Sequence, residues 1–250
     1  MDVLALVTAV VALAGAAVTA VLGYWAQRRL RTLDQRNLME AYGAALAWAA
    51  YDLQSRLFNI LRGHAIEQTP GKGHGFLTGF LTEGTAEDGE YARRSTVFLL
   101  AEYLGWVEIL RRDVQFLDLG RSRTNQQVMG KISEIGSILN RTPSGGPEPL
   151  RVFRTQQRAI GELMVHPEGE PGRRRCLGYA EFCAKLDTDD NFRRWFRQLL
   201  ADIDSLAEHP GPSLPRLEEI QHRLIGLIDL LDPKSEQFPQ SRRPFGQHAG

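Results

Sequence analysis

A long uncharged segment near the N-terminus constrains the fold of this chain most strongly. From Val3 to Ala26 the sequence has no charged side chain and consists mainly of Val, Leu and Ala. A helix rises about 1.5 Å per residue, so a helix of this length exceeds the roughly 30 Å of apolar bilayer. The sequence therefore predicts a single transmembrane helix within an anchor over residues 1–27.

The charges that flank this segment predict its orientation. Asp2 precedes the segment, and four arginines follow it, Arg28, Arg29, Arg31 and Arg36. A cleaved signal peptide carries its positive charge before a shorter apolar region, so a retained anchor is favoured over cleavage. By the positive-inside rule, the N-terminus lies outside and the rest of the chain is cytoplasmic. These features predict a single-pass protein of the cell membrane.

The apolar residues after the anchor recur at helical spacing. We expect the anchor to continue into a long helix through Ile60 with a stop at Gly63, followed by a loop over residues 69–89 with a short turn at 76–81. Further helices are expected at Arg93–Asp118, Val128–Leu139, Leu150–Val165, Leu177–Leu186, Asn191–Ala207 and Leu214–Leu231, the last capped by Ser213.

Alternation at a period of two residues, the signature of strands, is not found. The predicted fold class is therefore all-α, with the transmembrane helix running into a soluble multi-helix bundle. The cytoplasmic helical domain is expected over residues 28–232. The tail, residues 233–250, contains three prolines and few apolar residues, so it is predicted to be disordered.

No motif in the sequence assigns a catalytic residue, a metal ligand or a cofactor. Asp187, Asp189 and Asn191 match the start of a calcium loop, but the match fails at Phe192 and Gln198, so helix capping is predicted instead. Glu219 and His222 have the spacing of a di-iron ligand pair. Such a site needs two of these pairs, and this one is expected to face solvent.

One group of basic residues is a candidate binding surface. Its members are Arg173, Arg174, Arg175, Arg193, Arg194 and Arg197. They could bind phosphates, acidic lipid headgroups or an acidic partner, although a solvated surface is the favoured interpretation. The chain as a whole has 30 basic and 30 acidic residues, so no nucleic acid partner is expected.

Two functions from different classes fit these observations. The first is a membrane-anchored protein-interaction, scaffold or self-associating module at the inner membrane face. Its partners would be the bilayer, a membrane protein or a second copy. A second helix could pack closely here, because Gly15, Thr19 and Gly23 recur every four residues. The alternative is a membrane-bound enzyme with a site assembled from dispersed acids and histidines, namely Glu102, Glu108, His64, His74 and His166. An accessory subunit of a larger membrane complex is a third hypothesis.

Overall fold

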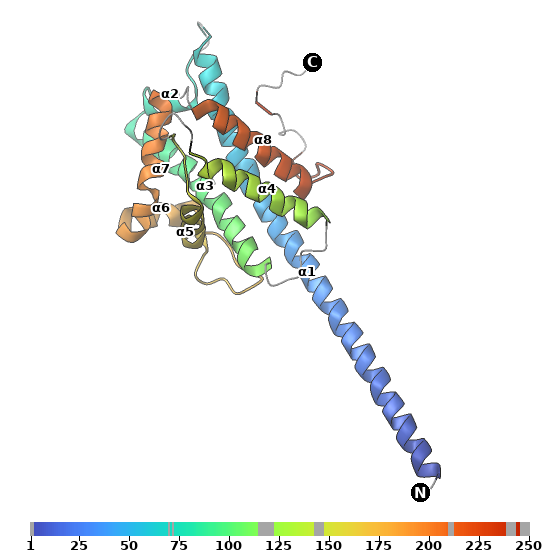
Figure 1. Ribbon diagram of the computed structural model, residues 1–250. Helices are drawn as coiled ribbons and strands as arrows, with labels where there is room; N and C mark the ends of the chain where they lie inside the picture. Colours follow the sequence, from blue (N-terminus) through green and yellow to red (C-terminus); the bar gives the residue numbers. More distant parts are fainter. Residues whose placement is uncertain are drawn as a thin grey trace. The chain divides into compact units, whose positions relative to one another are not determined.

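The computed structural model describes residues 3–69, 71, 73–114, 123–142, 148–209, 213–238 and 244–245. The helices are α1 Val3–Glu67, α2 Phe76–Leu81, α3 Ala86–Val114, α4 Arg123–Asn140, α5 Arg154–Met164, α6 Tyr179–Thr188, α7 Asp190–Glu208 and α8 Leu214–Leu231 (Figure 1). In these ranges the only β-type pairing is an isolated bridge between Val165 and Cys176. The predicted all-α multi-helix fold is confirmed.

The chain divides into two compact units, Met1–Ala41 and Tyr42–Gly250. In the first unit the described side chains are those of residues 12, 13, 15–25 and 27, and all of them are exposed. The hydroxyl of Thr19 donates to the carbonyl of Gly15 at 2.8 Å, so this polar group is satisfied within the helix.

Across the part of the chain that the structure describes, no helix combines the length and the apolar character that a membrane crossing requires. The predicted transmembrane helix is therefore not confirmed and stays a prediction.

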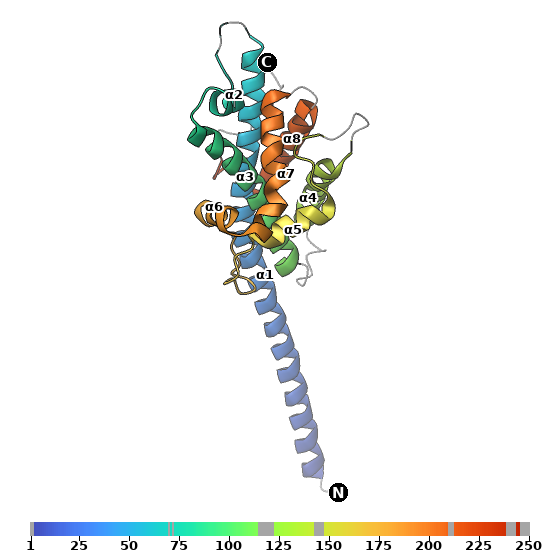
Figure 2. The same ribbon diagram turned by 90° about the vertical axis from the view of Figure 1, so that its left-hand side faces the viewer.

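In the second unit the remainder of α1 packs between α3 and α8. Arg56 of α1 donates to the hydroxyls of Ser95 and Thr96 on α3 at 3.0 and 2.9 Å. On the other side, Gln221 of α8 donates to Gln54 at 3.1 Å. α4 lies alongside α8, and α5 and α7 lie against α3 (Figures 1 and 2). Apolar side chains between these helices form the core.

The long helix does not stop at Gly63, as the sequence predicts, but continues to Glu67. A Cβ atom at position 63 would lie 2.8 Å from the Cα of Gly75, so only glycine allows the chain before α2 to approach this closely. Gly63 is therefore a packing residue inside a helix. The prediction that the helix ends at Gly63 was therefore wrong.

Other helix boundaries also differ from the prediction, and α4 begins at Arg123 rather than Val128. α3 begins at Ala86 rather than Arg93, because Thr85 and Asp88 form reciprocal bonds: the N–H of Thr85 donates to Asp88 at 2.9 Å, and the N–H of Asp88 donates to the Thr85 hydroxyl at 3.1 Å. α5 begins at Arg154 rather than Leu150. The end predicted at Asp118 lies outside the described residues.

The segment after α8, predicted to be disordered, packs against the bundle where it is described. Phe238 is 3% exposed, and its ring centroid lies 4.6 Å from that of Trp48 and 4.7 Å from that of Tyr51. Asp232 accepts bonds from the backbone N–H groups of residues 236–238. Residues 233–238 therefore differ from the prediction, since aromatic contacts and a local cap hold them.

Candidate functional site

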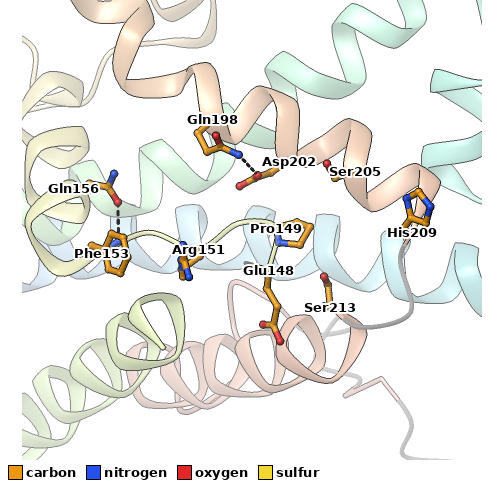
Figure 3. Close-up of a pocket in the computed structure, with 10 residues that line it drawn as sticks. All are labelled: Glu148, Pro149, Arg151, Phe153, Gln156, Gln198, Asp202, Ser205, His209 and Ser213. Carbon is orange, nitrogen blue, oxygen red and sulfur yellow. Dashed lines mark hydrogen bonds between the residues drawn. The ribbon is translucent and has the colours of Figure 1, made fainter. Parts of the chain in front are cut away.

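A cleft of about 620 Å³ opens where the segment before α5 passes α7 and the start of α8. Its lining residues are Glu148, Pro149, Arg151, Phe153, Gln156, Gln198, Asp202, Ser205, His209 and Ser213 (Figure 3). Ligand sites are concave and carry placed polar groups, and eight of these ten residues have polar or charged side chains. This cleft therefore is the candidate functional site.

A strained residue supports one wall of the cleft. Leu150 has a φ of 57°, in the left-handed region that a non-glycine residue rarely adopts. Its N–H donates to the Asp202 carboxylate at 2.8 Å, and its carbonyl accepts a bond from the Arg216 guanidinium at 2.8 Å. The backbone is thus held on both sides. Strain of this kind persists only where the surroundings enforce it, and it is concentrated at functional sites.

Asp202 is the buried acid of the cleft, with 6% exposure. Besides the Leu150 N–H, it accepts a bond from the Gln198 amide at 2.8 Å (Figure 3). Burial raises the pKa of this carboxyl, and the two hydrogen bonds oppose the rise. Asp202 therefore acts mainly as a fixed acceptor that organises the wall.

Arg216, at the start of α8, lies behind the cleft and is 3% exposed. Its guanidinium donates to Glu148 at 3.0 Å and to the carbonyl of Leu139 at 3.2 Å. Burial lowers the pKa of this guanidinium, and the Glu148 carboxylate counteracts that effect. The Nε–H of Arg216 has no hydrogen-bond partner among the described residues.

Ser213 lines the cleft and carries a buried hydroxyl for which no described residue is a partner. Ser213 is at the N-cap position of α8, as predicted, but its side chain makes no capping bond. The residue is 1% exposed, and its hydroxyl has no partner in the described part of the chain. Buried polar groups are normally hydrogen-bonded, so this hydroxyl is an exception among the described residues. The prediction that the Ser213 side chain caps α8 was therefore wrong.

The rim of the cleft combines an aromatic ring with hydrogen-bond donors. The Arg151 guanidinium lies 4.9 Å from the centroid of the Phe153 ring, which is 42% exposed. The Oε1 atom of Gln156 accepts a bond from the Phe153 N–H at 2.9 Å, which leaves its amide group available (Figure 3). Such a surface can bind carbonyl oxygens and an apolar side chain together.

Comparison with protein-family models, curated proteins and solved structures finds no match to this chain. The residues singled out by the sequence are therefore assessed from the structure alone.

The six arginines of the predicted basic surface have different surroundings. Arg174 donates to Asp113 at 2.8 Å, and Arg193 donates to Asp190 at 2.8 Å. Arg175 lies 2.7 Å from the ring nitrogen of His166. Arg173, Arg194 and Arg197 are exposed, and the Arg194 guanidinium lies 5.9 Å from the Trp195 ring centroid. Half of the group is thus engaged in internal contacts, and binding by these arginines stays a prediction.

Asp113 explains why Arg174 is held. Its carboxylate also accepts bonds from the Tyr42 hydroxyl at 2.7 Å and the Gly172 N–H at 2.9 Å. Burial alone would raise the pKa of Asp113, but these bonds and the Arg174 charge lower it. Burial and the bond to Asp113 raise the pKa of Tyr42 to about 12. The network fixes the loop before α6 against α1 and α3.

The acids and histidines of the enzyme hypothesis do not converge in the described residues. Glu108 bonds Arg111 and Arg112, as its helical spacing predicts, while His74 pairs with Glu83 and His166 with Glu181. His64 contacts Gln68. Glu102 lies near Asp52, and burial together with that charge raises its pKa to about 7. No group of three or more metal-binding side chains is found in the described ranges.

The two motifs resembling metal sites have structural roles. The Asp189 carboxylate accepts bonds from the N–H groups of Asn191 and Phe192 at 2.9 and 3.1 Å, which confirms the predicted cap of α7. Glu219 pairs with Arg141 at 2.8 Å. His222 lies 2.8 Å from the carbonyl of Phe245. Glu219 and His222 therefore both contact residues from other parts of the chain.

Proposed function

We propose that this protein is held at the inner face of the cell membrane by the N-terminal part of α1, and that its helical domain binds a partner protein. One observation carries the first half of the proposal. Between residues 13 and 25 of α1, six large apolar side chains are each more than half exposed, namely Leu13, Val18, Val21, Leu22, Tyr24 and Trp25. At 100° per residue they spread over half of the helix surface, and the positions between them carry small or uncharged side chains.

A helix without a charged face requires an apolar environment. The uncharged run in the sequence is 24 residues long, and about 20 suffice for a transmembrane helix. Tyr24 and Trp25, followed by arginines, have the order expected at a membrane interface. These sequence features support a lipid bilayer as the environment and a cytoplasmic position for the remainder of the chain.

Charged substitutions in the uncharged N-terminal segment test whether it holds the protein at the membrane. Val18→Glu together with Leu22→Glu should move the protein from the membrane fraction to the supernatant, because each charge at the centre of a membrane helix costs roughly 2.5–3.5 kcal/mol. Val18→Ile with Leu22→Ile is the matched control and should remain in the membrane fraction. A wild-type chain that is soluble and dimerises through α1 would show that a second copy, and not lipid, covers these side chains.

The second half of the proposal assigns the partner to the cleft beside Ser213. A polypeptide supplies both the carbonyl acceptors and the side chains that the donors and the Phe153 ring can bind. Protein interfaces are also enriched in aromatic residues and arginine, which Phe153 and Arg151 provide at the rim.

A photo-crosslinking residue tests the cleft directly. Placed at Ser205, which is exposed and lines the cleft, it should yield one discrete protein adduct in intact cells. The same residue at Thr188, exposed at the end of α6 and outside the cleft, should not yield that adduct. The Ser205 adduct should also weaken when Phe153 is replaced by Ala. Equal adducts from both positions would contradict the assignment.

A further inference from the structure

A second cavity, of about 250 Å³, lies between α3, α4 and α5 and is separate from the cleft. Its apolar wall consists of Leu104 and Val107 on α3 with Met129 and Ile132 on α4. Met129 is 39% exposed, so this wall reaches the surface. The volume lies just below that of typical drug-sized pockets, which suits one small ligand.

Three arginines surround this apolar wall, Arg111, Arg154 and Arg158. The lining carboxylate, Glu108, is fully engaged: one oxygen accepts from Arg111 at 2.8 Å, and the other accepts from Arg111 and Arg112 at 2.7 Å. Glu108 is therefore already paired with Arg111 and Arg112, and the two arginines of α5 have no counter-ion among the lining residues. The cavity has an excess of positive charge.

The two arginines of α5 are placed to bind an anion. Arg154 is held in position because its Nη2 donates to the Ser133 carbonyl and the Ser137 hydroxyl. Its Nη1 and Nε make no hydrogen bond to any described residue. The Arg158 side chain is 59% exposed, and its carboxylate neighbour, Glu162, is 3.8 Å away. Guanidinium groups with free donors bind carboxylates and phosphates strongly.

A buried hydroxyl adds an independent indication of a ligand. Tyr103 lines the cavity and is 1% exposed. Its hydroxyl has no hydrogen-bond partner among the described residues. An unpaired buried hydroxyl is unfavourable, and pairing with a ligand oxygen would require the Tyr103 side chain to shift toward the cavity. The Tyr103 hydroxyl and the Arg154 guanidinium thus offer donors at this site, and Arg158 has only the long contact with Glu162.

We infer that this cavity binds a small amphipathic oxyanion, with its apolar chain against Val107, Met129 and Ile132 and its anionic oxygens on Arg154 and Arg158. An apolar chain matches the wall, and an oxyanion offers only acceptors to the free donors. A free fatty acid and an acidic lipid share this chemistry. This site is independent of the membrane tether and of the partner-binding cleft.

Calorimetric titration of the full chain in phosphatidylcholine nanodiscs, with empty discs subtracted, tests the site. Decanoate should bind at least about tenfold more tightly than decanol, because only decanoate offers an anion to the arginines. Arg158→Gln should weaken decanoate binding about tenfold, whereas Arg62→Gln, an exposed arginine of α1, should not change it. Val107→Phe should block binding by filling the apolar space.

Tyr103→Phe distinguishes a ligand role from a packing role. It should weaken decanoate binding while the Tm without ligand stays equal or rises, since a buried unpaired hydroxyl is removed. Addition of phosphatidylglycerol to the discs identifies the source of the oxyanion. Competition with decanoate supports a lipid headgroup in the cavity, and its absence supports a free anion. Equal affinity for decanoate and decanol, or an equal loss in Arg62→Gln and Arg158→Gln, would overturn the inference.

Discussion

At the scale of single residues, buried polar side chains determine how the segments of this bundle are joined. Asp202, Arg216 and Asp113 each bond backbone groups or side chains that are distant in sequence. Asp202 and Arg216 together hold Leu150 in a left-handed conformation. Loss of such a bond leaves a buried group unpaired, which costs more than a surface contact contributes.

Asp202→Ala should lower the free energy of unfolding by roughly 1–3 kcal/mol, because the Leu150 N–H loses its acceptor. Asp204→Ala, two residues further along α7, breaks a half-exposed pair with Arg93 and should cost roughly 0–1 kcal/mol. Urea unfolding followed by circular dichroism measures both values. Equal changes in the two variants would mean that the clamp on Leu150 contributes little.

Glu102 should make the stability of the bundle depend on pH. Its pKa in the folded protein is about 7, against the ordinary value of 4.5, because the side chain is buried and lies near Asp52. Below pH 4.5 the folded and unfolded states both keep the proton. Between pH 4.5 and about 7 the unfolded state loses it first, so the free energy of unfolding falls as the pH rises, and it stays lowered above pH 7.

Glu102→Gln removes this titration while retaining the shape of the side chain. The variant should therefore be more stable than the wild type at pH 8, with little difference at pH 4. Urea unfolding at the two pH values provides the measurement. A variant that is less stable than the wild type at pH 8 would contradict the assigned pKa.

At the scale of helices, close approach between backbones fixes the packing of α5 on α3. A Cβ atom at Gly161 would lie 2.7 Å from the carbonyl oxygen of Leu104 and 2.9 Å from the Cβ of Glu108. Neither atom is the end of a flexible side chain, so α5 would have to move away. Gly130 on α4, in contrast, has nothing within 4 Å of such an atom.

Gly161→Ala should therefore destabilise the bundle by about 1–2 kcal/mol, as overpacking exceeds the gain in helix propensity. Gly130→Ala should stabilise it by about 0.5–1 kcal/mol through propensity alone. Urea unfolding of the two variants compares the effects. The account of this helix crossing would be wrong if both substitutions were stabilising.

The periodicity of apolar residues was enough to predict the helices but not all of their ends. α8 was predicted with both boundaries, because Pro215 and the apolar stripe are local signals. The start of α3 was also readable, since Thr85 and Asp88 have the spacing of a capping box, but the glycines around them favoured a loop. Gly63 was wrongly predicted to end the helix. A glycine is needed there for the close contact with Gly75, and that contact is set by the tertiary fold.

The candidate cleft could not be predicted from the sequence. Its central bond joins Leu150 to Asp202, 52 residues apart, and no local pattern indicates that pair. Ser213 carried a misleading signal, because serine before a helix is typical of a cap, whereas here its hydroxyl makes no capping bond to the described part of α8. The predicted arginine surface followed from sequence proximity alone, and the bonds of Arg174 and Arg193 are set by the folded chain.

At the scale of the whole molecule, the apolar N-terminal part of α1 belongs to the same helix as the first element of the helical domain. The apolar side chains from Leu13 to Trp25 are unfavourable when exposed to water, whereas the second unit has a buried core of its own. A tether would concentrate the domain near its partners without contributing contacts to the bound complex. The central claim is therefore that this domain is membrane-bound and faces the cytoplasm.

Protease accessibility of a C-terminal tag in intact cells tests this claim most directly. The account predicts a full-length tagged chain that sediments with membranes, is protected in intact cells and is digested once the membrane is permeabilised. A shortened chain, a chain in the soluble fraction, or a tag that is digested in intact cells would contradict it.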